Sequence, residues 1–594
     1  MSDHPVFSDQ AGSGSAVPPP PPPPSGVSGP SPRRRWRTLV LVGAALVLVL
    51  ALTGGVASWL LLRGPQPVDT AVAYTEAWAD QDYEAMGDLA AGESAELVAA
   101  HTEVAERLGV DAVQVDLGDV AYDPETDTRA SAPVGVTLEL DRAGAWSYDS
   151  ELHLELSADT WQVDFTPATI HPDLSEGMTL ARVNDWEERG HVLAADGTRI
   201  DSEQASGSLQ LLSGSVGAAD AEEAEELGPI YAEGDPVGLS GLQRTFQEEL
   251  AGSPATSIRV VDVDAEDPTA ADLAEDPEEF PEVEAFAGQP GTDVTTTIDV
   301  AVQQAAEQTI ATAEEPSALV AVRPDTGEIL ASANAPAGYD RAVAGQYAPG
   351  STFKVVSYAA LLDAGMGMDA TLDCPETATV GGWEFSNAGD AAYGEQSVTE
   401  AFATSCNTAL LQEVEQRLDA EDQLAAAQQF GFNTELDIGV AATEPQFPDP
   451  DGAPRLIAES MGQGQLLTSP LHMATIPAAV SAGQWHAPRL VTAPEPTDVP
   501  EPRPIASAEE LRSMMRAVIT EGTAEDAGFG DGVFGKTGSA EYGEREDEDD
   551  ELESHAWFVG FDEGHDIAFA VLVEGGGSGG GVAAPLGADF LAAL

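Results

Sequence analysis

A run of 25 consecutive uncharged residues, 38–62, most limits how this chain can fold. A helix of that length can cross the hydrocarbon core of a bilayer with some tilt. Four arginines lie just before it, between positions 33 and 37, and acidic sequence follows. Because basic residues stay on the cytoplasmic side of an anchor, the pattern predicts a single-pass protein with an extracytoplasmic body after Gly64. A cleaved secretory signal is the competing interpretation, but its apolar part is usually only about 7–15 residues long.

The residues before this run, 1–37, are low in complexity and include seven consecutive prolines at positions 18–24. Such a composition cannot bury a core, so we interpret the segment as a disordered cytoplasmic tail. A polyproline docking ligand is the alternative interpretation.

Composition restricts the partners of the body. The chain has 103 Asp and Glu against 24 Lys and Arg, a formal net charge of −79, which argues against nucleic acid and indicates a solvated acidic surface. No metal-ligand spacing surrounds the histidines, and we expect neither a metal nor a cofactor. The only two cysteines, Cys374 and Cys406, exclude a disulfide framework. Outside the cytoplasm, inert thiols and a bridge between the two both stay open.

Sequence patterns divide the body into three parts and predict a multidomain α+β protein. Residues 66–167 begin with helical periodicity, interrupted at Gly92, and continue with the alternation of a small antiparallel sheet. Residues 170–290 are rich in Gly, acidic residues and short strands, hold no nucleophile beside a base, and are expected to be structural. Residues 292–594 have strand patterns at both ends, a hairpin turn at 325–327 and a helical middle, which predicts an antiparallel sheet flanked by helices.

Lysine occurs at only two positions, Lys354 and Lys536, among 24 basic residues. Arginine supplies a fixed positive charge, whereas a lysine that is removed from water can lose its proton near neutral pH. The composition therefore suggests that these two positions carry out amine chemistry.

The first lysine follows a serine, Ser351, by three positions at the predicted start of a helix, so that Ser351 and Lys354 share one face. A serine becomes a strong nucleophile when a base takes its proton, and a lysine with a lowered pKa can be that base. The helix start adds backbone N–H groups suited to a developing oxyanion. Taken alone, this pattern is equally well explained by a capped surface helix.

Two further motifs follow in the chain. Ser405-Cys406-Asn407 stands at the head of another helical stretch, and Lys536-Thr537-Gly538 lies in a predicted strand. Together with Ser-x-x-Lys, these motifs are the set found in penicillin-binding proteins and certain β-lactamases.

The chain resembles the class B penicillin-binding proteins over nearly all of its body. Besides the three motifs, "ESMGQGQLLTSPLHMA" and "HAWFVGF" are similar to segments of the transpeptidase domain, which the resemblance places at 292–594. "ERGHVLAADGTRI" and "GLSGLQRTFQEELAG" look like parts of the dimerisation or pedestal domain, at 170–290. Residues 66–167 resemble the NTF2-like domain of MecA-type proteins, some of which have low affinity for β-lactams.

The resemblance implies a serine acyl-enzyme mechanism on stem peptides ending in D-Ala-D-Ala, and acylation by β-lactams. Ser351 would attack the carbonyl between the two D-alanines, and Lys354 would accept the serine proton. Ser405 would relay that proton to the leaving amine. Asn407 would hold both the peptide and Lys354 in place.

The resemblance also implies the residues that bind the substrate. Lys536 would supply positive charge near the terminal carboxylate, and Thr537 would donate a hydrogen bond to it. Gly538 would allow close approach of the peptide to the strand. The backbone N–H groups of Ser351 and Ser539 would form the oxyanion hole.

Two other functions share some of these features. A membrane-anchored serine β-lactamase would also be acylated, but would hydrolyse the acyl-enzyme rapidly. A non-catalytic β-lactam sensor or a scaffold for division or elongation proteins would only bind, although 1–37 is too short for a signalling domain. The acidic run 541–553 after the third motif is interpreted as a solvated hairpin loop, with gating of the site as the alternative.

Overall fold

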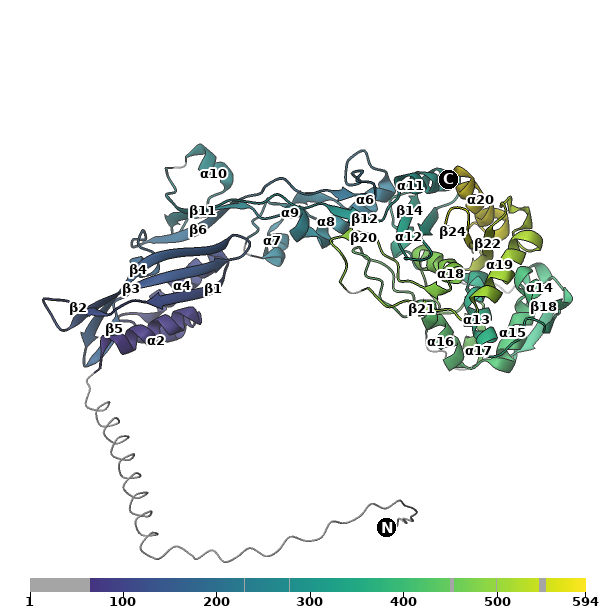
Figure 1. Ribbon diagram of the computed structural model, residues 1–594, viewed down its shortest axis with the longest axis horizontal. Helices are drawn as coiled ribbons and strands as arrows, with labels where there is room; N and C mark the ends of the chain where they lie inside the picture. The colour runs from purple at the N-terminus through teal and green to yellow at the C-terminus, as the bar shows by residue number, and fades with distance from the viewer. Residues whose placement is uncertain are drawn as a thin grey trace, which may run out of the picture.

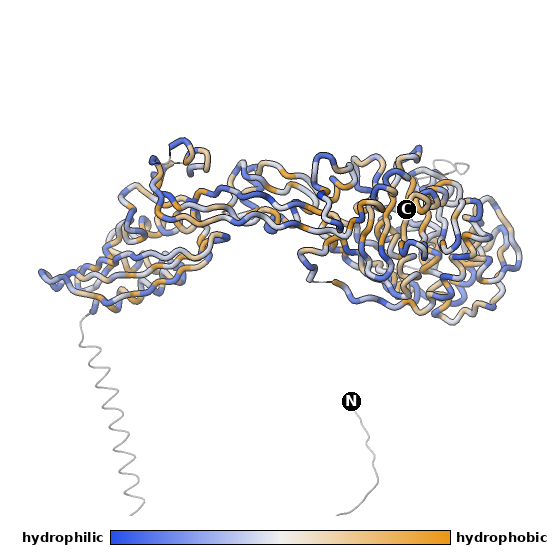
Figure 2. Tube along the Cα trace, turned by 45° about the horizontal axis from the view of Figure 1, so that its top comes forward, coloured by the Kyte–Doolittle hydropathy of each residue, from blue (hydrophilic) through white to orange (hydrophobic). Residues whose placement is uncertain are grey.

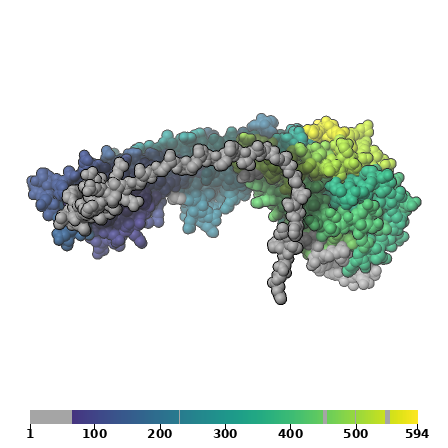
Figure 3. Space-filling view, turned by 60° about the horizontal axis from the view of Figure 1, so that its bottom comes forward, coloured from purple at the N-terminus to yellow at the C-terminus, as the bar shows by residue number. Residues whose placement is uncertain are grey.

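The computed structural model describes residues 65–228, 230–265, 267–276, 278–448, 453–497, 499–543 and 552–594. The predicted tail and membrane anchor, 1–37 and 38–62, lie outside these residues. Within the described ranges, no helix is both long enough and apolar enough to span a bilayer. The body is elongated, with the N-terminal domain at one end and the large C-terminal domain at the other (Figures 1 and 3).

The N-terminal domain combines four helices with an antiparallel sheet of order β1-β3-β4-β5, and β2 pairs with β3. Its elements are α2 (Pro67–Ala79), α3 (Tyr83–Leu89), α4 (Ser94–Leu108), β1 (Val110–Leu117), β2 (Ala121–Tyr122), β3 (Arg129–Leu140), β4 (Gly144–Ser157), β5 (Thr160–Val163) and α5 (Pro167–Ile170). The predicted helices and sheet are confirmed, except that the first predicted helix is interrupted between α2 and α3. Gln81 has a positive φ of 54° and Asp82 caps α3 by accepting from the Ala85 N–H, so the first predicted helix is two.

The core of this domain extends into the next part of the chain. Hydrophobic and hydrophilic residues alternate along its strands (Figure 2), and the buried ones pack against Tyr74 and Trp78 of α2. A second sheet of order β11-β10-β6 joins the same core through Leu180 and Ile258. These strands are β6 (Met178–Asp185), β10 (Ala255–Asp262) and β11 (Glu282–Phe286).

The middle of the chain links the two ends with short elements. They are β7 (Val192–Leu193), α6 (Gly207–Ser213), β8 (Val216–Ala218), α7 (Ala221–Leu227), β9 (Pro236–Gly238), α8 (Gly241–Thr245), α9 (Gln247–Ala251) and α10 (Ala270–Glu275). The two segments that resemble pedestal sequences meet here, because Arg189 donates to Gln243 and Gln247 side chains at 2.7 and 2.9 Å. Val192 and Leu212 belong to the core of the C-terminal domain. Residues between the two end domains therefore contribute to the hydrophobic cores of both of these domains.

The first and last strands of the C-terminal domain form one antiparallel sheet of order β14-β13-β24-β23-β22, as predicted. The strands are β13 (Ser317–Val322), β14 (Ile329–Ala335), β22 (Val533–Glu541), β23 (Ser554–Asp562) and β24 (Ile567–Val573). The turn between β13 and β14 contains Gly327 with φ +73°, which confirms the predicted hairpin. Helices α11 (Val300–Ile310) and α20 (Ala584–Ala593) pack on one face, and α18 (Pro470–Ala482) packs on the other.

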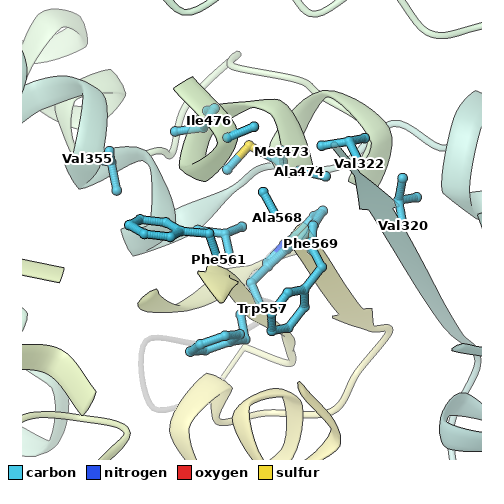
Figure 4. Packing of buried hydrophobic residues seen from close by; sticks show 14 of the residues in the cluster. Val320, Val322, Val355, Met473, Ala474, Ile476, Trp557, Phe561, Ala568 and Phe569 are labelled. Atoms are coloured by element: carbon cyan, nitrogen blue, oxygen red, sulfur yellow. The ribbon is translucent and has the colours of Figure 1, made fainter. Parts of the chain in front are cut away.

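The central strands are buried on both faces, because helices cover the sheet on each side. Figure 4 shows Met473, Ala474 and Ile476 of α18 above Ala568 and Phe569 of β24. Strand β22 lies at the edge of this sheet, where it contacts α19 and η1.

The helical middle contains the remaining elements. Those before position 450 are α12 (Arg341–Ala344), η1 (Gly350–Phe353), α13 (Lys354–Asp363), β15 (Thr371–Cys374), β16 (Thr377–Val380), β17 (Trp383–Ser386), η2 (Ala388–Asp390), β18 (Gly394–Ser397), α14 (Val398–Ala403), α15 (Asn407–Arg417) and α16 (Ala420–Gln429). The others are α17 (Ala453–Ser460), β19 (Gln484–Trp485), β20 (Val491–Ala493), β21 (Arg503–Pro504), α19 (Ala508–Glu521), η3 (Glu525–Ala527) and η4 (Gly579–Ala583). Strand β12 (Val294–Thr296) pairs with β7 and β20.

Candidate active site

The turn that carries Ser351 lies directly against the edge strand β22. Ser351 is in the 3-10 turn η1, which continues into α13 at Lys354, so the predicted helix start is confirmed. Two glycines permit the contact. A Cβ on Gly350 would lie 2.4 Å from the Ser539 carbonyl oxygen, and one on Gly538 would lie 2.8 Å from Thr352 Cγ2. Turn and strand therefore touch backbone to backbone, and the two expected oxyanion-hole residues, Ser351 and Ser539, are brought together.

Lys354 is fully buried and directed at the second motif. Its Nζ donates to the Ser405 carbonyl oxygen at 2.6 Å, to Asn407 Oδ1 at 2.6 Å and to Ser405 Oγ at 3.3 Å. Burial, followed by the nearby charge of Lys536, holds the pKa of Lys354 well below its usual value. A lowered pKa favours the neutral form of this amine, which is the form that can accept a proton.

Lys536 is also fully buried, in the middle of β22. Its Nζ donates to Ser405 Oγ and to the Thr537 carbonyl oxygen, each at 2.9 Å, and lies 5.7 Å from the centre of the Phe402 ring. Burial lowers the pKa of Lys536 to about 7. Neither lysine forms an ion pair with a carboxylate in the described part of the chain, so an incoming carboxylate would be the counter-charge of this site.

Ser405 connects the two lysines from a strained loop between α14 and α15. It has a φ of +57°, a left-handed conformation that is unusual for a residue other than glycine and persists only where the surroundings hold it. The adjacent Cys406 forms a disulfide with Cys374 at the end of β15. Of the two arrangements that the sequence left open, the structure has the bridge, and both sulfurs are buried.

Asn407, the first residue of α15, uses both ends of its side-chain amide. Its Oδ1 accepts from Lys354 and its Nδ2 donates to the Ser386 carbonyl oxygen at 3.0 Å. Because Nδ2 is engaged on one side, Oδ1 faces the lysine. The expected contact of Asn407 with Lys354 is therefore present.

Thr537 and Ser539 lie on β22 next to a glycine-rich segment. Thr537 Oγ1 lies 2.6 Å from Thr523 Oγ1, and Ser539 Oγ accepts from the Gly579 N–H at 3.3 Å. A Cβ on Gly579 would lie 2.3 Å from the Gly538 carbonyl oxygen. The glycine-rich run 574–581 thus packs tightly against the third motif.

The Ser351 side chain is the one predicted catalytic group that makes no hydrogen bond with another described residue. It is partly exposed, and its carbonyl oxygen accepts from the Lys354 N–H. In free enzymes, catalytic hydrogen bonds are often long and shorten only when substrate binds. Ser351 is thus held by its turn, while its hydroxyl stays accessible to a substrate.

Three residues of the site had no signal in the sequence. Asn387 bonds the start of α15, Phe402 faces the Lys536 ammonium, and Thr523 contacts Thr537. Phe402 lies in α14, and Asn387 and Thr523 lie in loops. Asn387 and Thr523 are 20 and 14 positions from their partners. No group of three or more metal-ligating side chains occurs in the described part of the chain.

Comparisons with known proteins agree with this site. Residues 317–592 match the penicillin binding protein transpeptidase domain, and residues 66–178 match the NTF2-like N-terminal transpeptidase domain. The peptidoglycan D,D-transpeptidase PbpA of Mycolicibacterium smegmatis is 31% identical over 369 residues, which cover 51% of this chain and 72% of that protein.

Two solved structures share the fold. The PBP2 of Pseudomonas aeruginosa, solved in complex with WCK 5153, aligns with a TM-score of 0.56 at 23% identity, over 70% of this chain and 96% of that chain. The penicillin-binding protein A of M. tuberculosis, solved as an imipenem acyl-enzyme complex, aligns with a TM-score of 0.52 at 24% identity, over 68% of this chain and 98% of that chain.

The site and the comparisons lead to the same assignment. A serine turn, two buried lysines and a shared hydroxyl stand on the elements of a transpeptidase domain, behind an NTF2-like domain. The chain therefore belongs to the penicillin-binding D,D-transpeptidases.

Proposed function

We propose that this protein crosslinks peptidoglycan stem peptides through an acyl-enzyme on Ser351. The observation that carries the proposal is the pair of buried lysines that donate to the same hydroxyl, Ser405 Oγ, beside the Ser351 turn. Their environments differ, because burial lowers the pKa of both lysines and the charge of Lys536 lowers that of Lys354 further, which favours Lys354 as the neutral base and Lys536 as the cation. Acyl transfer from a peptide with a free terminal carboxylate needs a neutral base to accept the serine proton and a cation to bind the carboxylate, and this site offers both.

Acylation follows from these positions. Ser351 Oγ attacks the carbonyl carbon of the penultimate D-alanine while its proton passes to Lys354 Nζ. The negative charge that develops on the carbonyl oxygen is stabilised by the N–H groups of Ser351 and Ser539. The bond from the carbonyl carbon to the nitrogen of the last residue breaks, and the proton returns through Ser405 to that nitrogen as D-alanine leaves.

Substrate binding uses the other lysine. The terminal carboxylate of the peptide lies beside Lys536 and accepts a hydrogen bond from Thr537, which compensates the buried ammonium. In the second half-reaction, an amine from another stem peptide attacks the ester carbonyl of the acyl-enzyme. Its proton passes to Lys354, the carbonyl–Oγ bond breaks, and Lys354 gives the proton to the departing Oγ, which restores the Ser351 hydroxyl and the neutral amine.

The location of the reaction rests on the sequence of the N-terminal segment. Residues 38–62 would anchor the protein in the cell membrane, with 1–37 in the cytoplasm and the catalytic domain outside, where peptidoglycan is assembled. Division or elongation proteins would be its partners at the membrane. Protease added to intact spheroplasts tests this topology: it should digest the body or release it by cleavage after position 64, whereas protection of the body from the protease would contradict the proposal.

The acyl-enzyme is tested by mass spectrometry of the purified body after incubation with labelled penicillin. We expect one covalent adduct, on the peptide that contains Ser351, and no adduct in a Ser351→Ala variant. The matched control is Ser357→Ala, six positions further along the chain in α13, which should still be acylated. An adduct on another residue, or none in the wild type, would contradict the proposal.

The two rival functions give different results in two further assays. A β-lactamase would turn over many equivalents of nitrocefin, whereas the transpeptidase should be acylated once and release product slowly. A sensor or scaffold would be acylated by penicillin but release no D-alanine from a stem pentapeptide. Crosslinked product together with D-alanine release would support the transpeptidase.

A further inference from the structure

A buried asparagine that lies outside the three motifs holds the beginning of α15. Asn387 follows β17 and is 5% exposed. Its Oδ1 accepts from the backbone N–H groups of Asn407 and Thr408 at 2.8 and 3.1 Å. Its Nδ2 donates to the carbonyl oxygens of Pro375 and Ala391, both at 2.8 Å. Both ends of the amide are thus engaged, and the side chain has one orientation.

Asn387 takes the place of a local helix cap. The first N–H groups of a helix lack partners within the helix and need acceptors from outside it. The residue before α15 is Cys406, whose sulfur, engaged in the disulfide, reaches only the Ala409 N–H at 3.2 Å. Asn387, 20 positions upstream, therefore supplies the acceptor for the first two N–H groups.

Asn387 and its neighbour Ser386 together also fix the side chain of Asn407. The backbone N–H of Asn407 is held by Asn387, and its side-chain Nδ2 is held by the carbonyl oxygen of Ser386. With backbone and amide nitrogen both engaged, Oδ1 must face Lys354, to which it lies at 2.6 Å. Asn387 therefore holds, through Asn407, one of the three acceptors of the Lys354 amine, the other two being oxygens of Ser405.

We propose that Asn387 is a positioning residue of the acyl-transfer site, which orients Asn407 and through it the Lys354 amine. The inference rests on the proposed function. Asn387 does not touch the substrate or the serine, so its loss should slow acylation and leave non-covalent binding of the β-lactam unchanged. A displacement of about 1 Å in a catalytic group can cost about 100-fold in rate.

The test compares Asn387→Ala with a matched variant in the same domain. Asn334 is 6% exposed, lies on β14 at the opposite edge of the sheet from β22, and accepts from the Ala342 N–H of another helix at 2.9 Å. Stopped-flow acylation by a fluorescent penicillin gives the rate constant and the non-covalent Kd, below the unfolding temperature of both variants. We expect Asn387→Ala to lower the rate constant about 10- to 100-fold with Kd unchanged, and Asn334→Ala to change neither by more than about threefold.

A double-mutant cycle tests whether the effect passes through Asn407. In an Asn407→Ala background, Asn387→Ala should cause less than about threefold further loss, because residues that act as a unit are not additive. Equal losses in the two backgrounds would overturn the proposal. So would equal effects of Asn387→Ala and Asn334→Ala.

A second variant keeps the test decisive if Asn387→Ala does not fold. Asn387→Asp retains an acceptor for the two N–H groups but cannot donate to Pro375 and Ala391, so we expect a lower Tm with acylation close to that of the wild type. A rate as low as that of Asn407→Ala would overturn the proposal. Failure of the wild type itself to be acylated on Ser351 would instead remove the proposed function.

Discussion

Lys354 and Lys536 both donate to a single oxygen, Ser405 Oγ, at 3.3 and 2.9 Å. Two buried ammonium groups that contact the same oxygen would repel each other strongly, which favours loss of the proton from one of them. The arrangement joins the expected base to the expected carboxylate-binding cation through one hydroxyl.

Replacement of Lys354 by arginine should slow acylation strongly. A guanidinium keeps its proton, so Lys354→Arg retains a cation but cannot act as the base. We expect the rate of acylation by penicillin to fall about 10²- to 10⁴-fold, the usual contribution of general base catalysis. Lys536→Arg is the comparison, since it keeps the charge and should lose much less. Similar losses in the two variants would mean that Lys354 is not the base.

Acylation should have a bell-shaped dependence on pH. Lys354 must be neutral, so the rate rises as pH increases through its lowered pKa, and Lys536 must be charged, so the rate falls as pH increases through about 7. The ratio of the acylation rate constant to Kd should therefore be largest below about pH 7. At saturating β-lactam the falling limb should shift to higher pH, because the bound carboxylate favours the charged lysine.

The control for this profile is Lys536→Arg, whose side chain stays charged. Its falling limb should disappear from the measured range. A wild-type rate that rises steadily up to pH 9 would rule out this assignment of the two lysines.

A methyl group at Gly538 should separate the serine turn from β22. The Cβ of Gly538→Ala would lie 2.8 Å from Thr352 Cγ2 and 3.0 Å from the Pro349 carbonyl oxygen, both tighter than normal contacts. We expect a loss of about 1–3 kcal/mol in the free energy of unfolding, with a marked fall in acylation. Gly530→Ala is the matched control, since its Cβ would meet nothing within 4 Å. Unaltered acylation in Gly538→Ala would show that the turn and the strand need not touch.

The disulfide between Cys374 and Cys406 should stabilise the domain. It closes a loop with a sequence separation of 32. By the chain-entropy relation, removing such a bridge costs about 3–4 kcal/mol. A Cys374→Ala, Cys406→Ala double variant should therefore show a lower Tm, measured by calorimetry, and a reducing agent should lower only the Tm of the wild type. An equal response of both proteins to the reducing agent would contradict a bridge.

Much of the molecule could be predicted from local pattern. Helical periodicity and alternation placed the helices and strands of the N-terminal domain, and the strand patterns at both ends of 292–594 indicated the antiparallel sheet that the structure has. The spacing of Ser351 and Lys354 on one turn is also a local property. The extra break before Asp82 was missed because a capped turn of three polar residues resembles the surface of a continuous helix.

The sequence by itself determined which side chains are the candidates for catalysis, because the scarcity of lysine and the three motifs are properties of the chain. Only the tertiary structure decided how they meet. The bond from Lys536 to Ser405 spans 131 positions, and those from Asn387 to Asn407 and from Thr523 to Thr537 span 20 and 14. Such contacts depend on how sheet, turn and loops pack in three dimensions, where a local pattern carries no information about the partner.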